Sequence, residues 1–153
     1  MIQKASKVLQ LLQGKTLVTA ESITGGGIGT AITGISGASN VYKGGVISYC
    51  DEVKRDVLGV PAEVLQRYGA VSAWTAGYMA SGARKLLRAD YAVSVTGLAG
   101  PTADEFGHPV GTVFIGFESQ SKALVRQFRF EGDREAIRSQ TIDAALQLIL
   151  ENA

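Results

Sequence analysis

The stretch 19–27 places a serine, Ser22, shortly before three consecutive glycines. It reads Thr-Ala-Glu-Ser-Ile-Thr-Gly-Gly-Gly and follows a short apolar, β-branched run, a pattern typical of a strand that turns into a helix. Such a corner presents a side chain and several free backbone N–H groups at one point. Ser22 would supply the hydroxyl there, and Gly25, Gly26 and Gly27 would let a ligand approach the backbone closely.

The same corner also has a plainer interpretation, in which Ser22 or Thr24 caps a helix and the glycines only allow tight packing. It is not a Walker loop, because no Gly-Lys-Ser/Thr follows at the required spacing. It also lacks the last glycine of the dinucleotide-binding fingerprint. The stretch alone therefore leaves a catalytic and a structural interpretation open.

A serine nucleophile needs a base, and imidazole is the usual one. The only histidine, His108, lies in the loop 104–109, where a lone histidine is more often solvated than catalytic. The only cysteine, Cys50, is expected at a buried strand end without a partner, which disfavours it as a nucleophile. A single cysteine excludes an intrachain disulfide and fits a reducing cytoplasm, where we expect the protein to reside.

The alternative base for a serine is a neutral lysine, and Lys54 is the candidate. It follows Asp51, a predicted N-cap, so the positive end of a helix dipole would disfavour its ammonium form. Burial against Tyr49 would act in the same direction. Tyr49 could also relay a proton between the serine and the amine. The alternative is that Lys54 is a surface lysine and Tyr49 a core tyrosine.

A further glycine-rich corner, Val95-Thr-Gly-Leu-Ala-Gly-Pro101, also follows a predicted strand. Ligands bind at the carboxyl ends of strands in open α/β sheets. We expect substrate contacts from this corner at Thr96, Gly97 and Gly100. Two arginines at the start of the last helix, Arg134 and Arg138, could add charge for a phosphate, and one of them is expected to be only structural.

Helical periodicity, capping residues and Gly or Pro stops predict helices at 2–13, 24–35, 52–58, 61–68, 74–87 and 134–150. Ser72 and Asp133 are the expected N-caps of the last two helices. β-Branched and apolar runs predict strands at 17–20, 45–50, 91–96, 111–117 and 123–130, the last two forming a hairpin. Alternating elements followed by a late hairpin indicate one α/β domain, a three-layer α/β/α sandwich with a mixed central sheet.

Composition excludes several classes of function. The chain has 153 residues, a formal net charge of +1 and no basic tract, which argues against a nucleic-acid ligand. No run approaches membrane-spanning length, so no membrane association is expected. One histidine, one cysteine and no carboxylate pair at ligand spacing predict neither a metal site nor another cofactor.

Taken together, these motifs resemble the CinA C-terminal domain family. The residues that carry the resemblance are Thr-Ala-Glu-Ser-x-Thr-Gly-Gly at 19–26, Gly-Gly-Val-Ile-Ser-Tyr at 44–49, Lys54, Gly-Ala-Val-Ser at 69–72, Thr-Gly-Leu-Ala-Gly-Pro at 96–101 and Pro-Val-Gly-Thr-Val at 109–113. They cover nearly the whole chain in order. The chain resembles the stand-alone, PncC-type members of that family, without the nucleotide-hydrolysing domain of longer relatives.

The resemblance implies hydrolysis of the carboxamide of nicotinamide mononucleotide to nicotinate mononucleotide and ammonia. It implies a Ser-Lys mechanism with a participating tyrosine, matching Ser22, Lys54 and Tyr49, and no cofactor. We also expect a homo-oligomer, with a dimer favoured. Two positions depart from the family pattern: Ile23 replaces the usual cysteine, and the loop after Pro101 lacks the common glycines.

Two rival functions remain at this stage. A domain of the same fold could be a catalytically silent nucleotide-binding or protein-interaction module. It could also hydrolyse another small amide with the same chemistry. Retention of Ser22, Tyr49 and Lys54 together favours an enzyme, because a binding module has no need of all three.

Overall fold

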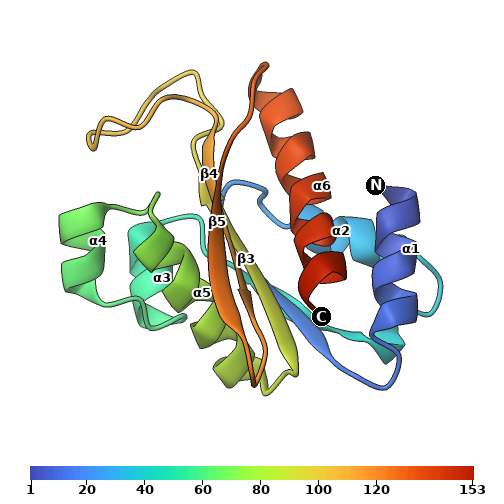
Figure 1. Ribbon diagram of the computed structural model, residues 1–153. Coiled ribbons are helices and arrows are strands. Elements are labelled where there is room, and N and C mark those ends of the chain that lie inside the picture. Colours follow the sequence, from blue (N-terminus) through green and yellow to red (C-terminus); the bar gives the residue numbers. More distant parts are fainter.

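The computed structural model describes residues 1–153 as one α/β domain (Figure 1). Five strands form one sheet in the order β2-β1-β3-β4-β5. Their bounds are β1 (Leu17–Glu21), β2 (Tyr42–Ile47), β3 (Tyr91–Gly97), β4 (Thr112–Glu118) and β5 (Ala123–Arg129). Strands β2, β1 and β3 run parallel, whereas β4 and β5 add antiparallel, so the predicted mixed sheet and hairpin are confirmed.

Helices cover both faces of this sheet. The α-helices are α1 (Ile2–Leu11), α2 (Gly27–Thr33), α3 (Asp51–Asp56), α4 (Ala62–Tyr68), α5 (Ala73–Leu87) and α6 (Arg134–Asn152), with a short 3-10 helix, η1 (Ala38–Asn40). Figure 1 shows α1, α2 and α6 on one side of the sheet and α3, α4 and α5 on the other. The predicted three-layer sandwich is therefore confirmed.

The central strand β3 explains why two cores form. Successive side chains of a strand point to opposite faces. Val93 accordingly packs into the larger core with α1, α2 and α6, while Ala92 packs into the smaller core with α4 and α5. Both residues are fully buried, as expected for a continuous apolar strand.

Two predicted N-caps are confirmed. The Ser72 side chain accepts a hydrogen bond from the Thr75 amide at 3.0 Å, and the Asp133 side chain accepts one from the Ala136 amide at 2.9 Å. These bonds satisfy backbone donors that the first helical turn leaves free. Asp51, by contrast, is the first residue of α3 and not its cap, which is Cys50.

Several element boundaries also differ from the prediction by a few residues, and two of these differences shape the site. Helix α2 begins at Gly27, not at Thr24, because Gly25 and Gly26 have φ values of +58° and +102°. Such left-handed conformations cannot continue a right-handed helix. Strand β2 ends at Ile47, so the segment 48–50 is a connection instead of a strand end, and Cys50 is exposed there.

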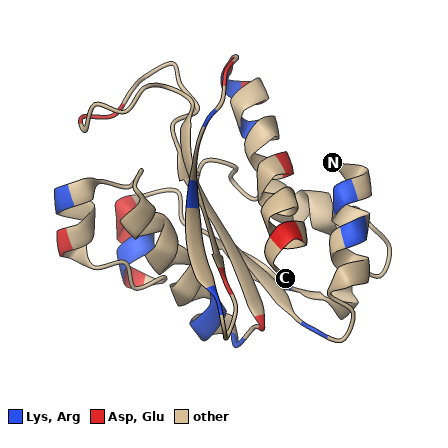
Figure 2. Ribbon diagram, viewed as in Figure 1, with Lys and Arg blue, Asp and Glu red and all other residues tan.

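Charged residues of both signs are interspersed along the chain, in agreement with the net charge of +1 (Figure 2). None of the helices is long and apolar enough to span a membrane.

Gly82 of α5 lies where the segment after α3 packs against this helix, and we predict that this packing requires a glycine. A Cβ atom at this position would overlap the carbonyl oxygen of Leu58. We expect Gly82→Ala to destabilise the protein by about 1–3 kcal/mol through overpacking, which should lower Tm by several degrees in a thermal melt. Gly77→Ala, on the same helix, is the control, because its Cβ would lie 3.7 Å from Val125 Cγ2 in ordinary contact. Equal melting temperatures for the two variants would contradict this prediction.

Candidate active site

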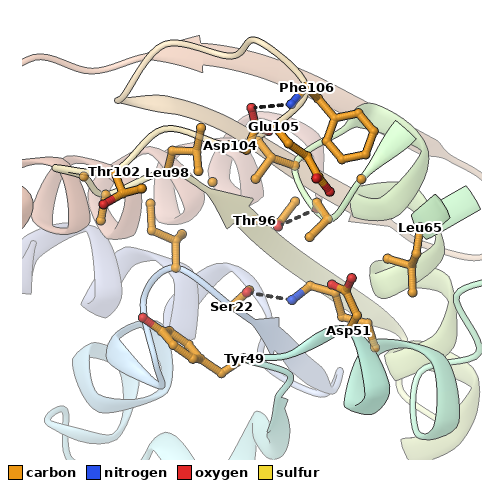
Figure 3. Close-up of a pocket in the computed structure, with 18 of the residues that line it drawn as sticks. Ser22, Tyr49, Asp51, Leu65, Thr96, Leu98, Thr102, Asp104, Glu105 and Phe106 are labelled. Carbon is orange, nitrogen blue, oxygen red and sulfur yellow. Dashed lines mark hydrogen bonds between the residues drawn. The ribbon is translucent and has the colours of Figure 1, made fainter. Parts of the chain in front are cut away.

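A cavity of about 630 Å³ opens where the carboxyl ends of β1 and β3 meet the connection between β2 and α3. The loop between β3 and β4, the first turn of α6, Leu65 and residues 69–71 form the rest of its wall. The residues of the cavity that matter for chemistry are Ser22, Tyr49, Lys54, Thr96, Gly97 and Arg134. Segments far apart in the sequence thus supply one concave site (Figure 3).

Ser22 follows directly after β1 and is 8% exposed. Its amide donates to the carbonyl of Val95 at 3.0 Å, which extends the pairing of β1 with β3 by one residue. Its carbonyl accepts from the Gly25 amide at 3.1 Å, so the chain reverses immediately. This sharp turn, residues 22–26, is called the Ser22 turn below. It fixes the serine at the cavity wall.

Lys54, on helix α3, contacts this serine directly. Its Nζ lies 2.9 Å from Ser22 Oγ and donates to the Ser48 carbonyl oxygen at 2.6 Å. Figure 3 marks the bond to Ser22 by a dashed line. Lys54 is only 1% exposed, and it is among the largest fully buried side chains of the protein. A buried lysine bound to a serine and a carbonyl, with no carboxylate, is poised to lose its proton.

Burial is the main cause that lowers the pKa of Lys54 below its ordinary value. The negative charge of Asp51 acts in the opposite direction and offsets part of this effect. Lys54 does not lie at the positive end of the helix dipole, contrary to the prediction, because α3 has only six residues and Lys54 is in its last turn. Desolvation, and not the helix N-terminus, therefore favours the neutral amine.

Tyr49 does not bridge Ser22 and Lys54. Its side chain is 60% exposed, so it is not the core tyrosine of the alternative interpretation. Its hydroxyl accepts a hydrogen bond from Arg134 Nη2 at 2.9 Å, and Arg134 Nη1 donates to the Gly100 carbonyl at 2.9 Å. The direct contact between Lys54 and Ser22 makes a tyrosine relay unnecessary in this arrangement. Tyr49 and Arg134 instead form a polar edge of the cavity.

The structure separates the predicted substrate-binding residues into two groups. Those that line the cavity are Thr96, Gly97, Gly100 and Arg134. Those that lie outside its lining are Thr24, Gly25, Gly26, Gly27 and Arg138. The first group is therefore placed where a ligand could contact it. In the second group, Thr24, Gly25 and Gly26 belong to the Ser22 turn itself, and Arg138 hydrogen-bonds to it.

Arg138 shows this supporting role most clearly. Its Nε donates to the Ile23 carbonyl at 3.1 Å, and its Nη2 donates to the Thr24 carbonyl at 3.0 Å. A guanidinium that holds two backbone carbonyls stabilises the turn and leaves Arg134 as the arginine that lines the cavity. The sequence could place both arginines on one helix but could not distinguish them.

The backbone amides of the Ser22 turn also differ from expectation. The amides of Gly25 and Gly27 donate to the carbonyls of Ser22 and Thr24, at 3.1 and 3.0 Å, so they are not free to bind an oxyanion. The amide of Ile23, directly after Ser22, has no acceptor within the chain, and Ile23 lines the cavity. It is the better placed donor, as in other enzymes whose nucleophile sits on a strand-to-helix turn.

The loop between β3 and β4 supplies cavity residues that sequence reasoning did not identify: Asp104, Glu105 and Phe106. Burial alone would raise the pKa of Asp104, but hydrogen bonds from the His108 ring and backbone outweigh it and lower this pKa. The His108 Nδ1 atom lies 2.7 Å from Asp104 Oδ2, so the imidazole is engaged within its own loop. These contacts hold the two ends of residues 104–108 together, and no periodic pattern in the sequence predicts them.

The chain contains no group of three His, Cys, Asp or Glu side chains that could hold a metal ion. The chemistry described above uses only the serine, the lysine and backbone amides.

Comparisons with known proteins agree with this architecture. The family model described as "CinA C-terminal domain" matches residues 2–153. A CinA-like protein of Synechococcus sp. (strain RCC307) is 45% identical over 149 residues, which are 95% of this chain and 36% of that protein. The chain spans about a third of the length of the curated relatives it matches.

Solved structures show the same fold. The competence damage-inducible protein A from Klebsiella pneumoniae is 35% identical, with a TM-score of 0.96 over 99% of this chain and 95% of that one. A CinA superfamily protein from Escherichia coli is 31% identical, with a TM-score of 0.97 over 100% of this chain and 91% of that one.

The lowered pKa of Lys54 predicts a pH-dependent stability that Lys54→Met should remove. Between the lowered pKa of the folded state and the ordinary value of 10.5, the unfolded chain binds more protons at this residue. The contribution of Lys54 to the free energy of unfolding therefore rises with pH in this window, by at most about 1.4 kcal/mol per pH unit, and the methionine variant lacks this contribution. Urea unfolding of both proteins at a series of pH values measures the difference. A difference that does not change with pH would contradict the lowered pKa.

Proposed function

Because this chain belongs to the CinA C-terminal domain family, we propose that it is a serine amidohydrolase that converts nicotinamide mononucleotide to nicotinate mononucleotide and ammonia. The observation that carries the proposal is the hydrogen bond of 2.9 Å between the buried Lys54 Nζ and Ser22 Oγ at the cavity wall. A purely structural lysine gains little from burial next to a serine, because burial of its charge is costly. A base for that serine needs this environment.

In the acylation step, the neutral amine of Lys54 accepts the Ser22 proton while Oγ forms a bond to the carboxamide carbon. The carbonyl oxygen becomes an oxyanion, which the Ile23 amide is placed to stabilise. Removing one such donor in other enzymes costs about 3–4 kcal/mol. The Lys54 ammonium then gives its proton to the departing nitrogen, the carbon–nitrogen bond breaks, and ammonia leaves.

In the deacylation step, a water molecule replaces ammonia. Lys54 removes a proton from this water as its oxygen bonds to the ester carbon, and then returns the proton to Ser22 Oγ as that bond breaks. The product is the carboxylic acid of the same nucleotide, and the enzyme regains its starting state. One amine thus serves as base and acid in both steps.

The size of the cavity suits a mononucleotide, and Arg134 offers a positive charge for its phosphate. Pockets for small molecules usually have volumes of about 300–1,000 Å³, a range that includes this cavity. Arg134 uses two of its five N–H groups, toward Gly100 and Tyr49, so others are free for a phosphate. Thr96 already donates to the Ala70 carbonyl at 2.8 Å, so its oxygen can only accept from a ligand.

The test of this proposal is an ammonia-release assay with nicotinamide mononucleotide, free nicotinamide and NAD. We expect activity on the mononucleotide, and loss of that activity in Ser22→Ala with the fold retained. Lys54→Arg keeps a charge but cannot serve as a base, so it should lower kcat by about 10²–10⁴-fold. In the native enzyme, kcat/KM should rise with pH along the limb on which Lys54 loses its proton.

Three results would contradict the proposal. An active Ser22→Ala variant would exclude a covalent mechanism, and an active Lys54→Arg variant would make the lysine an electrostatic support. Equal activity on free nicotinamide would remove the need for a phosphate contact, and the substrate would then be another small amide.

The two arginines of α6 form a matched pair that tests the position of the phosphate. Arg134→Ala should raise KM for the mononucleotide by about 10- to 100-fold with little change in kcat, because contacts to a remote phosphate bind ground and transition states alike. Arg138→Ala should mainly lower kcat, because Arg138 holds the Ser22 turn. Steady-state kinetics of the two variants separate these effects. The opposite pattern would place the phosphate at Arg138.

A further inference from the structure

Glu21 is a buried acidic residue for which the mechanism above has no role. It is the last residue of β1, directly before Ser22, and it is 2% exposed. It forms no salt bridge, and no arginine or lysine hydrogen-bonds to its carboxyl group. Burial of a carboxyl group without a cation is costly unless hydrogen bonds replace its hydration.

Four hydrogen bonds supply this replacement. Oε1 accepts from Thr24 Oγ1 at 2.6 Å and from the Ile28 amide at 2.8 Å. Oε2 accepts from Thr19 Oγ1 at 3.1 Å and from the Gly29 amide at 3.0 Å. The carboxyl group therefore connects β1, Thr24 within the Ser22 turn, and the first turn of α2.

The direction of these bonds is determined by a neighbouring tyrosine. Tyr42 Oη lies 2.6 Å from Thr19 Oγ1. Because the Thr19 hydroxyl has one proton, which it donates to Glu21, Tyr42 must donate to Thr19. Burial is the main cause that raises the pKa of Tyr42, so this phenol keeps its proton. All four groups around Glu21 are thus donors.

The main chain of Glu21 is also connected to Lys54, through Ser48. Its carbonyl oxygen accepts from the Ser48 amide at 2.7 Å, and the Ser48 carbonyl oxygen in turn accepts from Lys54 Nζ at 2.6 Å. The side chain of Glu21 thus hydrogen-bonds to the turn that carries the nucleophile. Its backbone carbonyl hydrogen-bonds to Ser48, whose own carbonyl binds the amine of Lys54.

We infer that Glu21 is a positioning residue for the reaction, which sets the distance and angle between Ser22 Oγ and Lys54 Nζ. This inference rests on the proposed function in that it assumes that Ser22 is the nucleophile. Glu21 does not line the cavity and touches no substrate, so its effect is transmitted through the Ser22 turn. A misplacement of about 1 Å at a reacting atom can cost about 100-fold in rate.

Glu21→Gln and Thr24→Val are the variants that test this role. The glutamine is nearly isosteric, but its NH₂ group must face two donors on one side of the former carboxylate. Thr24→Val removes only the hydroxyl that bonds Glu21 at 2.6 Å, so it is the milder variant that is measured should Glu21→Gln fail to fold. Thr141→Val is the matched control, because Thr141 is also fully buried and its hydroxyl bonds only within α6.

Two readouts are compared for each folded variant, with folding checked by circular dichroism. The first is the kinetics on nicotinamide mononucleotide, where we expect kcat to fall by about 100-fold in Glu21→Gln and about tenfold in Thr24→Val, with KM nearly unchanged. The second is the rate at which an alkyl fluorophosphonate modifies Ser22, a reaction that forms a bond from Oγ to phosphorus and releases fluoride. Labelling rates should fall in the same order, and Thr141→Val should match the wild type in both readouts.

The outcomes separate this inference from the proposed function. Unchanged kcat and labelling in Glu21→Gln, a rise in KM alone, or equal losses in Thr141→Val would overturn the positioning role. A wild-type protein that releases no ammonia but is labelled at Ser22 would overturn the proposed reaction, and the labelling rates of the variants would then decide the role of Glu21. A wild-type protein inert in both assays would overturn both.

Discussion

The structure depends on one interaction, the hydrogen bond between the buried amine of Lys54 and the hydroxyl of Ser22. A lysine that is 1% exposed and has no carboxylate in hydrogen-bond contact is destabilised when it is charged. The fold tolerates this because two apolar cores stabilise the domain and the amine still has two hydrogen-bond partners. The loss in stability at this point and the larger fraction of neutral amine have the same cause, which is desolvation.

The sheet topology brings the two groups together. Parallel strands end at the same edge of a sheet, and ligands of open α/β sheets bind there. Ser22 follows β1, the connection to Lys54 follows β2, and Thr96 lies near the end of β3. The antiparallel strands β4 and β5 then return the chain to α6, whose first turns carry Arg134 and Arg138 to the same edge. Residues from these four parts of the sequence, with Arg134 and not Arg138 from α6, therefore line one cavity.

The sequence predicted much of this arrangement, and the failures have a common physical origin. Strand, helix and hairpin were predictable because periodicity, glycine stops and capping residues are local signals. Ser22 could be proposed from its glycine-rich corner. Lys54 could be proposed as the alternative to the lone histidine as a base, and the family resemblance supported both residues. The roles of Arg138 and Glu21 could not, because they depend on which donor meets which acceptor across the fold. For the same reason, the identity and position of Tyr49 in the sequence could not show that its hydroxyl hydrogen-bonds to Arg134 and not to Ser22.

The most direct test is a measurement of the pKa of Lys54 itself by NMR. The ¹³Cε resonance of each lysine can be followed against pH, and the signal of Lys54 is identified by its absence in Lys54→Met. We predict that Lys54 titrates clearly below the ordinary value of 10.5, because burial disfavours its charge. A Lys54 side chain that titrates at or above that value would be an ammonium at neutral pH, and the claim that it activates Ser22 would be wrong.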